Sequence, residues 1–300
     1  MATWLIIIVL AYFLYSLSSL GDKLVLNQSQ SPRAYVFFVG ILSLVVLLLI
    51  PFAGLDFSNA DKLIWPALAS LFFMGGLYFL YLGVNRFEVS RVVPIVGALQ
   101  PVLILFFGWL LFGNESIKQG YLLAFCVIFF ASLILSFEKK ISLTKDLLKV
   151  SFISAILTSL NFIFLKIVFE NMSFLQGTIW VGIFNAVISL LLITSRPLRQ
   201  EIFSKKEFFT KKSLLTVIIT QFFGGLAGFL QNLAISLAPV FALAIINALR
   251  GVQYVFLFFI TLVLSFFYPG VFYEKVSIKL ILQKGIAILL IIYGLAILVL

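Results

Sequence analysis

The feature that most constrains this chain is a succession of long apolar runs separated by short polar segments. A helix needs about 20 mostly apolar residues to cross the hydrocarbon core of a bilayer. Runs of that length, bounded by Gly, Pro, Asn or charged residues, cover 3–26, 33–54, 63–83, 89–112, 117–137, 147–169, 174–195, 213–236, 239–268 and 278–300. Lipid cannot satisfy unpaired backbone groups, and the alternation typical of a membrane barrel is missing, so each run predicts a helix. The sequence therefore predicts an all-α integral membrane protein with ten transmembrane helices.

The composition excludes a soluble globule and several kinds of chemistry. Apolar residues make up 63% of the 300 residues and charged residues 11%, where soluble domains have about 45–50% and 25%. Cys126 is the one cysteine and histidine is absent, so the usual zinc ligands and the usual general base are missing. A phosphate-binding Gly-x-x-x-x-Gly-Lys loop is also absent from the sequence. We expect no metal, no cofactor, no catalytic residue and no ATP-driven pumping.

Loop charges predict the orientation of the chain in the membrane. Loops after the first, third, fifth, seventh and ninth runs carry 17 Lys and Arg residues with their flanks, against two, Lys62 and Lys118, on the other side. Cytoplasmic loops of membrane proteins are enriched in Lys and Arg. We therefore expect a multi-pass protein of the plasma membrane with both termini outside. These loops explain the net charge of +10, so we expect the lipid bilayer, and not nucleic acid, as the partner.

An internal repeat is visible at an offset of 150 residues. Residues 71–101 and 221–251 share 8 identities, which include Phe72-Phe73 with Phe222-Phe223 and Ala98-Leu99 with Ala248-Leu249. Each half holds five predicted spans, an odd number, so the second half crosses the membrane in the opposite sense. Such inverted repeats are common in secondary transporters. We predict a first five-helix repeat over 1–142 and a second, inverted one over 143–300.

Motifs at matching places in the two halves suggest a known family. Lys23 and Lys166 lie near the end of the first span of each half. A Gly-Asn-Glu115 element precedes Gln119-Gly120, and its counterpart is Glu274 followed by Lys284-Gly285, stretched by six residues. With its two five-helix halves, the chain resembles the drug/metabolite transporter superfamily, and most closely its EamA-type ten-helix members.

The resemblance implies a function and a place for the binding site. Members of this superfamily mostly export amino acids and other metabolites, and related branches exchange sugar phosphates or nucleotide sugars. The resemblance also implies that the first, third, fourth, sixth, eighth and ninth helices enclose a central cavity.

Polar stripes pick out the same six helices independently. At 100° per residue, polar side chains of these helices fall on one face, whereas the second, fifth and tenth helices lack a comparable stripe. The stripes are Tyr12, Ser16, Ser19, Lys23 and Asn27; Tyr78, Tyr81 and Asn85; Gly97, Gln100 and Pro101; Ser154, Thr158 and Asn161; Gln221, Gly224, Gly228, Gln231 and Asn232; and Asn247, Arg250, Gly251 and Tyr254. As substrate-binding residues we predict Arg250, Asn247, Tyr254, Gln100, Tyr78, Tyr81, Gln231 and Asn232.

Arg250 is the most informative of these residues. It is the twelfth residue of its run, near the middle of the membrane, where an arginine costs roughly 2.5–3.5 kcal/mol. No acidic residue is predicted at matching depth, since Asp22, Glu88 and Glu170 lie near the ends of runs. We favour contact with an anionic group of the substrate over bonding to backbone carbonyls.

Several features also have a purely structural interpretation. A single Ser, Thr, Asn or Gln in a stripe is at least as well explained by hydrogen bonds between helices. For Lys23 and Lys166 we favour side chains that reach toward the membrane surface. Pro94 and Pro101 are interpreted first as a kink, with exposed carbonyls as the alternative.

The leading functional hypothesis is a secondary transporter, an exporter or exchanger, of a small metabolite such as an amino acid or another anionic solute. Transport by alternating access would follow from the two inverted halves. One alternative is a flippase or transporter of lipid-linked, nucleotide or phosphorylated sugars. An intramembrane lipid-phosphate enzyme is less favoured, since it would need clustered carboxylates, a metal or a histidine base. A homodimer remains an open alternative.

Overall fold

The computed structural model describes residues 3–26, 32–55, 60–87, 89–136, 144–194, 196, 199, 211–267 and 278–299. Across these residues the regular elements are all helical, and no strand is present. The first half contains α1 (Thr3–Leu26), α2 (Pro32–Leu42), η1 (Ser43–Leu49), α3 (Ile50–Ala53), η2 (Ala60–Leu63), α4 (Ile64–Arg86), α5 (Val89–Phe112), η3 (Gly113–Ser116) and α6 (Gln119–Ser136). The second half contains α7 (Lys145–Asn171), α8 (Phe174–Leu192), α10 (Lys211–Leu237), η5 (Val240–Ala242), α11 (Leu243–Ala248), α12 (Gly251–Phe267) and α13 (Ile278–Val299).

Local signals in the sequence account for several helix ends. The side chains of Thr144 and Ser173 accept hydrogen bonds from the first turns of α7 and α8, as N-cap residues do. Gly54 and Gly113 have positive φ angles of 68° and 62° where α3 and α5 end, a conformation that glycine adopts without steric cost.

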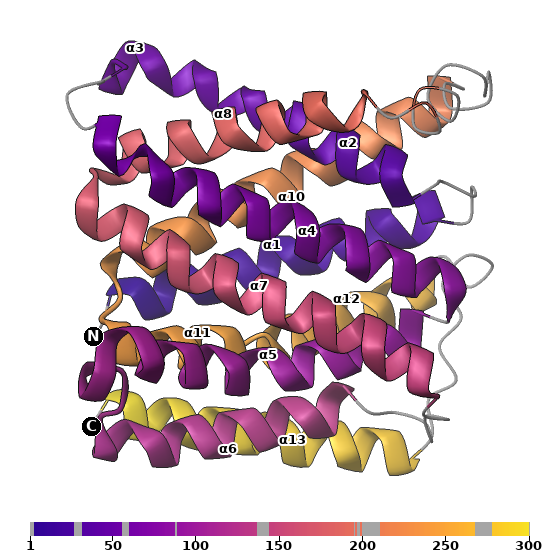
Figure 1. Cartoon of the computed structure of the whole chain (residues 1–300). Coiled ribbons are helices and arrows are strands. Elements are labelled where there is room, and N and C mark those ends of the chain that lie inside the picture. Colours follow the sequence, from indigo (N-terminus) through magenta and orange to yellow (C-terminus); the bar gives the residue numbers. More distant parts are fainter. Residues whose placement is uncertain are drawn as a thin grey trace.

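The helices pack side by side in a layered bundle (Figure 1). α8 and α2 lie at one edge of this view, α6 and α13 at the other, and α1, α4, α7 and α10 between them. The most extensive contacts join α1 to α10, α4 to α7 and α6 to α13. Both chain termini lie at the same end of the bundle (Figure 1).

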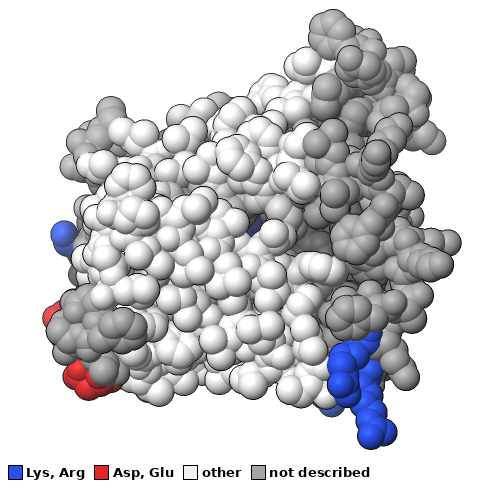
Figure 2. All heavy atoms as spheres, turned by 90° about the horizontal axis from the view of Figure 1, so that it is seen from above, with Lys and Arg blue, Asp and Glu red and all other residues white. Residues whose placement is uncertain are grey.

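The bundle has the length and surface of a membrane domain. Eight helical stretches are long and apolar enough to cross a bilayer, and the described parts of α6 and α13 form two shorter apolar helices. In Figure 2 most of the visible face is free of charged side chains: Lys, Arg, Asp and Glu lie toward its edges, apart from a small blue patch in a hollow near the centre. The chain is therefore a helical multi-pass membrane protein.

Hydrogen bonds from small polar side chains hold neighbouring helices together. Ser154 and Asn161 on α7 donate to the carbonyls of Gly76 (2.9 Å) and Ala69 (2.9 Å) on α4. Ser18 on α1 donates to the carbonyl of Thr220 on α10 (3.2 Å). The structural interpretation of the stripe on the sixth predicted span is thus correct for Ser154 and Asn161, and Ser18 plays the same part on the first span.

Two of the predicted spans are less regular than a single helix. The run 33–54 is interrupted by the 3₁₀ segment η1, and the run 239–268 is divided into η5, α11 and α12. The second interruption lies next to Arg250 and shapes the candidate site.

Candidate functional site

A break in the ninth predicted span places Arg250 between two helices. α11 ends at Ala248, Leu249 and Arg250 form a turn, and α12 begins at Gly251. Within this turn the backbone N–H of Arg250 donates to Asn247 (3.1 Å) and that of Val252 donates to Leu249 (2.9 Å). These i→i−3 bonds replace the i→i−4 bonds of an α-helix. The carbonyls of Ile246 and Ala248 consequently lose their usual helical donors.

Side chains from two other helices satisfy these carbonyls. The Tyr12 hydroxyl on α1 donates to the carbonyl of Ile246 at 2.6 Å, and the Ser132 hydroxyl on α6 donates to that of Ala248. Tyr12 is fully buried. Non-helical backbone at membrane depth requires such partners, because lipid offers none. The hydroxyls of Tyr12 and Ser132 therefore stabilise the break.

Arg250 reaches from this break to α5. Its Nη1 atom donates to Oε1 of Gln100 at 3.1 Å, and Tyr12 and Tyr15 on α1 lie within electrostatic range of the guanidinium. Arg250 is half-buried, whereas Gln100 is only 2% exposed. Gln100 thus offers this cation a neutral amide acceptor.

A small cavity adjoins the contact between Arg250 and Gln100. Its volume is about 10 Å³, room for about one water molecule. The wall is formed by α5, α6, α11, the turn and α12, through Gly97, Pro101, Phe129, Ser132, Leu133, Asn247, Ala248, Arg250, Gly251 and Tyr254. A metabolite would fit only if these helices moved apart.

Asn247 is the second polar group that points to a ligand. It is 1% exposed and lines the cavity, yet neither its Nδ2 nor its Oδ1 atom has a hydrogen-bond partner among the described residues. A buried amide without partners costs free energy, so such a group in a cavity wall indicates a place for water or a polar ligand. Asn247 and Arg250 together provide neutral and charged hydrogen-bonding groups.

The structure brings together four of the eight predicted site residues. Arg250, Asn247 and Tyr254 line the cavity, and Gln100 contacts Arg250 beside it. The other four are absent from this wall: Tyr78 and Tyr81 lie half-buried on α4, and Gln231 and Asn232 lie on α10.

Sequence reasoning missed the contribution of α6. Ser132 and Ser136 are four residues apart and share one helical face, but this pair falls short of the polar stripes on the other spans, and the fifth predicted span was expected to lack a role in the cavity. The structure shows Ser132 in the cavity wall, packed against Gly251 and bonded to the carbonyl of Ala248. Among the described residues, the walls of this cavity come from the fourth, fifth and ninth predicted spans.

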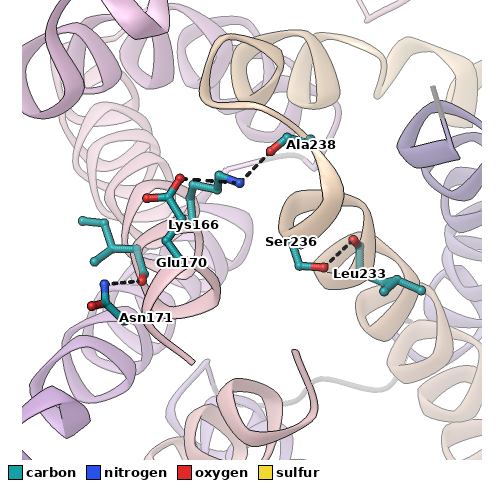
Figure 3. Close-up of polar contacts among 7 residues, drawn as sticks. Lys166, Glu170, Asn171, Leu233, Ser236 and Ala238 are labelled. Atoms are coloured by element: carbon teal, nitrogen blue, oxygen red, sulfur yellow. Dashed lines mark hydrogen bonds and ion pairs between the residues drawn. The ribbon is translucent and has the colours of Figure 1, made fainter. Parts of the chain in front are cut away.

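Lys166 on α7 has a different environment from that of Arg250 (Figure 3). Its Nζ atom donates to the carbonyl of Ala238 at 2.6 Å and lies 3.6 Å from Oε1 of Glu170. Lys166 is 6% exposed, so the expectation that it reaches the membrane surface is wrong. Ala238 lies just past the end of α10 and precedes Pro239. The buried ammonium thus ties α7 to the end of α10. The side chain of Lys23 lies outside the described residues.

Comparisons with known proteins agree with this architecture. Residues 2–137 match the model of the EamA-like transporter family. None of the curated proteins matches the chain. One crystal structure of a protein aligns over 97% of this chain and 94% of its own, with a TM-score of 0.69 and 16% sequence identity. At that identity the likeness shows a shared fold.

These findings define the class of the protein and its relatives. The fold is that of a helical multi-pass membrane protein. The match over its first half confirms the resemblance to EamA-like transporters of the drug/metabolite transporter superfamily.

Proposed function

We propose that the chain is a secondary transporter, an exporter or exchanger, of a small anionic metabolite, and that Arg250 binds the anionic group. The observation that carries this proposal is the pairing of a half-buried guanidinium with a neutral amide, next to the unpartnered Asn247. A guanidinium has five N–H donors suited to a carboxylate or phosphate. An anion would therefore gain more from this site than a neutral solute.

Alternating access between two inverted halves, 1–142 and 143–300, is supported by the way related positions meet. Gln100 and Arg250 are 150 residues apart, the offset of the sequence repeat, and they contact each other. In a two-fold arrangement, equivalent residues meet only close to the axis. The α1–α10 and α4–α7 contacts are equivalent under the same relation. The arrangement favours ten membrane helices with a binding site on the axis between the halves.

The small size of the cavity supports an occluded state within the transport cycle. The cavity between α5, α6 and the α11–α12 break has room for about one water molecule. Substrate would enter after one half moves relative to the other, and this movement would widen the cavity. Tyr78, Tyr81, Gln231 and Asn232 remain proposed contacts along the path opened by that movement.

For the orientation, we propose cytoplasmic placement of the end that carries Arg86, Arg91, Lys145 and Lys149. The opposite end carries Lys62 and Lys118 along with Asp61, Glu115 and Glu170. In a chain whose Cys126 is replaced, Lys145→Cys should react with an impermeant thiol reagent only in inside-out vesicles. Glu115→Cys should react from the outer face of intact cells. The reverse pattern would mean the opposite orientation.

The decisive experiment for the function substitutes Arg250. The purified protein is screened for thermal stabilisation by amino acids, other carboxylates and phosphorylated sugars, and the hit is then tested for uptake into liposomes. Arg250→Gln should weaken binding of that hit by about 1.5–3 kcal/mol, the range for hydrogen bonds to charged groups. Arg250→Lys should recover only part of the affinity, because an ammonium lacks the two-donor fork.

The stability of the variants separates binding from folding. In Arg250→Gln the new amide can still donate a hydrogen bond toward α5, so the melting temperature without ligand should change little. Full affinity in a well-folded Arg250→Gln protein would disprove the role of Arg250. A hit confined to lipid-linked sugars would support the flippase alternative instead.

A further inference from the structure

Gln100 occupies the position in which a substrate oxygen would meet Arg250. Its Oε1 atom accepts from the guanidinium at 3.1 Å, and the side chain is only 2% exposed. The Ser159 hydroxyl on α7 donates to the backbone carbonyl of Gln100 at 3.2 Å. The backbone that carries the Gln100 amide is therefore also held in place. A neutral amide oxygen here resembles, in shape and acceptor geometry, one oxygen of a carboxylate or phosphate.

A charged acceptor would displace this amide. Hydrogen bonds to an ionised acceptor are roughly twice as strong as bonds between neutral groups. An anion that reached Arg250 would therefore bind the guanidinium more strongly than Oε1 of Gln100 does. Asn247, three residues before Arg250, has an unpartnered amide in the same cavity wall, and it offers hydrogen bonds to the entering ligand or to the displaced Gln100.

We infer that Gln100 is a built-in stand-in for the substrate anion: substrate binds by displacing Gln100 from Arg250, and Gln100 thereby sets the affinity. The inference rests on the proposed role of Arg250 as the anion-binding residue. Gln100 belongs to α5, and Arg250 to the α11–α12 break in the other half. Displacement therefore removes a contact between the two halves at the moment when substrate binds. Substrate binding and the opening of the bundle are coupled through this exchange.

The test removes the acceptor and keeps the length of the side chain. In Gln100→Met, the anion no longer competes with an amide for Arg250. We use acetate as a minimal carboxylate and inorganic phosphate as a minimal phosphate, and measure the melting temperature of the purified protein against the concentration of each. The variant should reach half-maximal stabilisation at about a tenfold lower concentration of at least one anion, consistent with the loss of one competing hydrogen bond to a charged group.

A matched control comes from Gln283 on α13. Its side-chain amide donates to the carbonyl of Ile134 on α6 at 2.6 Å, so Gln283→Met also removes an amide that joins two helices, at a position outside the cavity wall. The control should lose stability without any change in the concentration dependence for either anion. A gain in anion affinity common to both variants would contradict the inference.

The remaining outcomes separate this inference from the proposed function. If Arg250→Gln binds the anions as well as the unmodified chain, the proposed function fails. If Arg250→Gln loses binding but Gln100→Met shows equal or weaker binding, then Gln100 is a passive neighbour or a direct substrate contact, and the inference fails alone. Absence of stabilisation by both anions in Gln100→Met also overturns it. If Gln100→Met does not fold, Gln100→Glu replaces it: an ion pair with Arg250 should weaken anion binding at least about tenfold, and unchanged binding overturns the inference.

Discussion

The two helical segments that meet at the Gln100–Arg250 contact differ in the continuity of their backbone: one is a single helix and the other is broken. α5 contains Pro94 and Pro101 yet runs as one helix from Val89 to Phe112. The segment through α11 and α12 contains no proline between 240 and 267, yet it breaks at Leu249 and Arg250. Proline removes a backbone donor wherever it stands. Because the segment with two prolines is continuous and the segment without proline is broken, proline does not determine where the helix is interrupted here.

The difference shows that neighbouring helices determine the position of the break. The turn at Leu249–Arg250 is flanked by two freed carbonyls, and each has a hydroxyl partner from another helix: Tyr12 for Ile246 and Ser132 for Ala248. Lipid offers no partner for a freed carbonyl, so an unpartnered one is unfavourable. The break therefore depends on residues that are distant in sequence, and substitutions there should affect the two segments unequally.

The largest effect is expected for Gly251→Ala, at the start of α12. A methyl group at this position would lie 3.0 Å from the backbone Cα of Ser132 and closer still to its side chain. Backbone atoms cannot rotate away, and the Ser132 hydroxyl would be pushed off the carbonyl of Ala248. We expect a loss of about 2–3 kcal/mol in the free energy of unfolding, the upper range for overpacking. Thermal or denaturant unfolding in detergent measures this loss.

Gly97→Ala on α5 is the matched control, since Gly97 lines the same cavity. A methyl group there would meet only the Tyr254 hydroxyl, at an ordinary contact distance of 3.8 Å. Replacing a glycine inside a helix by alanine should then leave stability unchanged or raise it by about 0.5–1 kcal/mol. Equal losses in the two variants would remove the proposed asymmetry between α5 and the broken segment.

Most of the fold was predictable, because the bilayer imposes a simple pattern on the sequence. Apolar runs with Gly, Pro or charge at their ends predicted α5 at 89–112 and α1 at 3–26 with the observed bounds. The prediction was wrong inside the run 239–268, which we expected to be a single helix. Leu249 and Arg250 carry no local signal for a turn, since the partners of the freed carbonyls come from α1 and α6.

The candidate site was predictable only where a single residue is energetically unfavourable in an apolar run. Arg250 stands out because an arginine in the middle of an apolar run needs a partner or water. The repeat related it to Gln100, but a sequence offset cannot show that the two side chains touch. Ser132 escaped notice because it and Ser136 form no stripe comparable to those of the other spans, and Lys166 was misjudged because burial near a helix end depends on packing by other helices.

A smaller loss than that of Gly251→Ala is expected for Tyr12→Phe, which tests whether the break needs its hydroxyl partner. The substitution removes one oxygen and leaves the ring in the core, so the bond to the carbonyl of Ile246 is lost. Hydrogen bonds between membrane helices contribute about 0.6 kcal/mol on average, and the buried carbonyl left behind adds a desolvation cost. We expect a loss of about 1–1.5 kcal/mol in unfolding free energy. Tyr293→Phe, at an exposed site on α13, should change it by less than about 0.5 kcal/mol. Equal small changes in the two variants would mean that the Ile246 carbonyl finds another donor, and the break would then depend on Ser132 and the tight contact at Gly251.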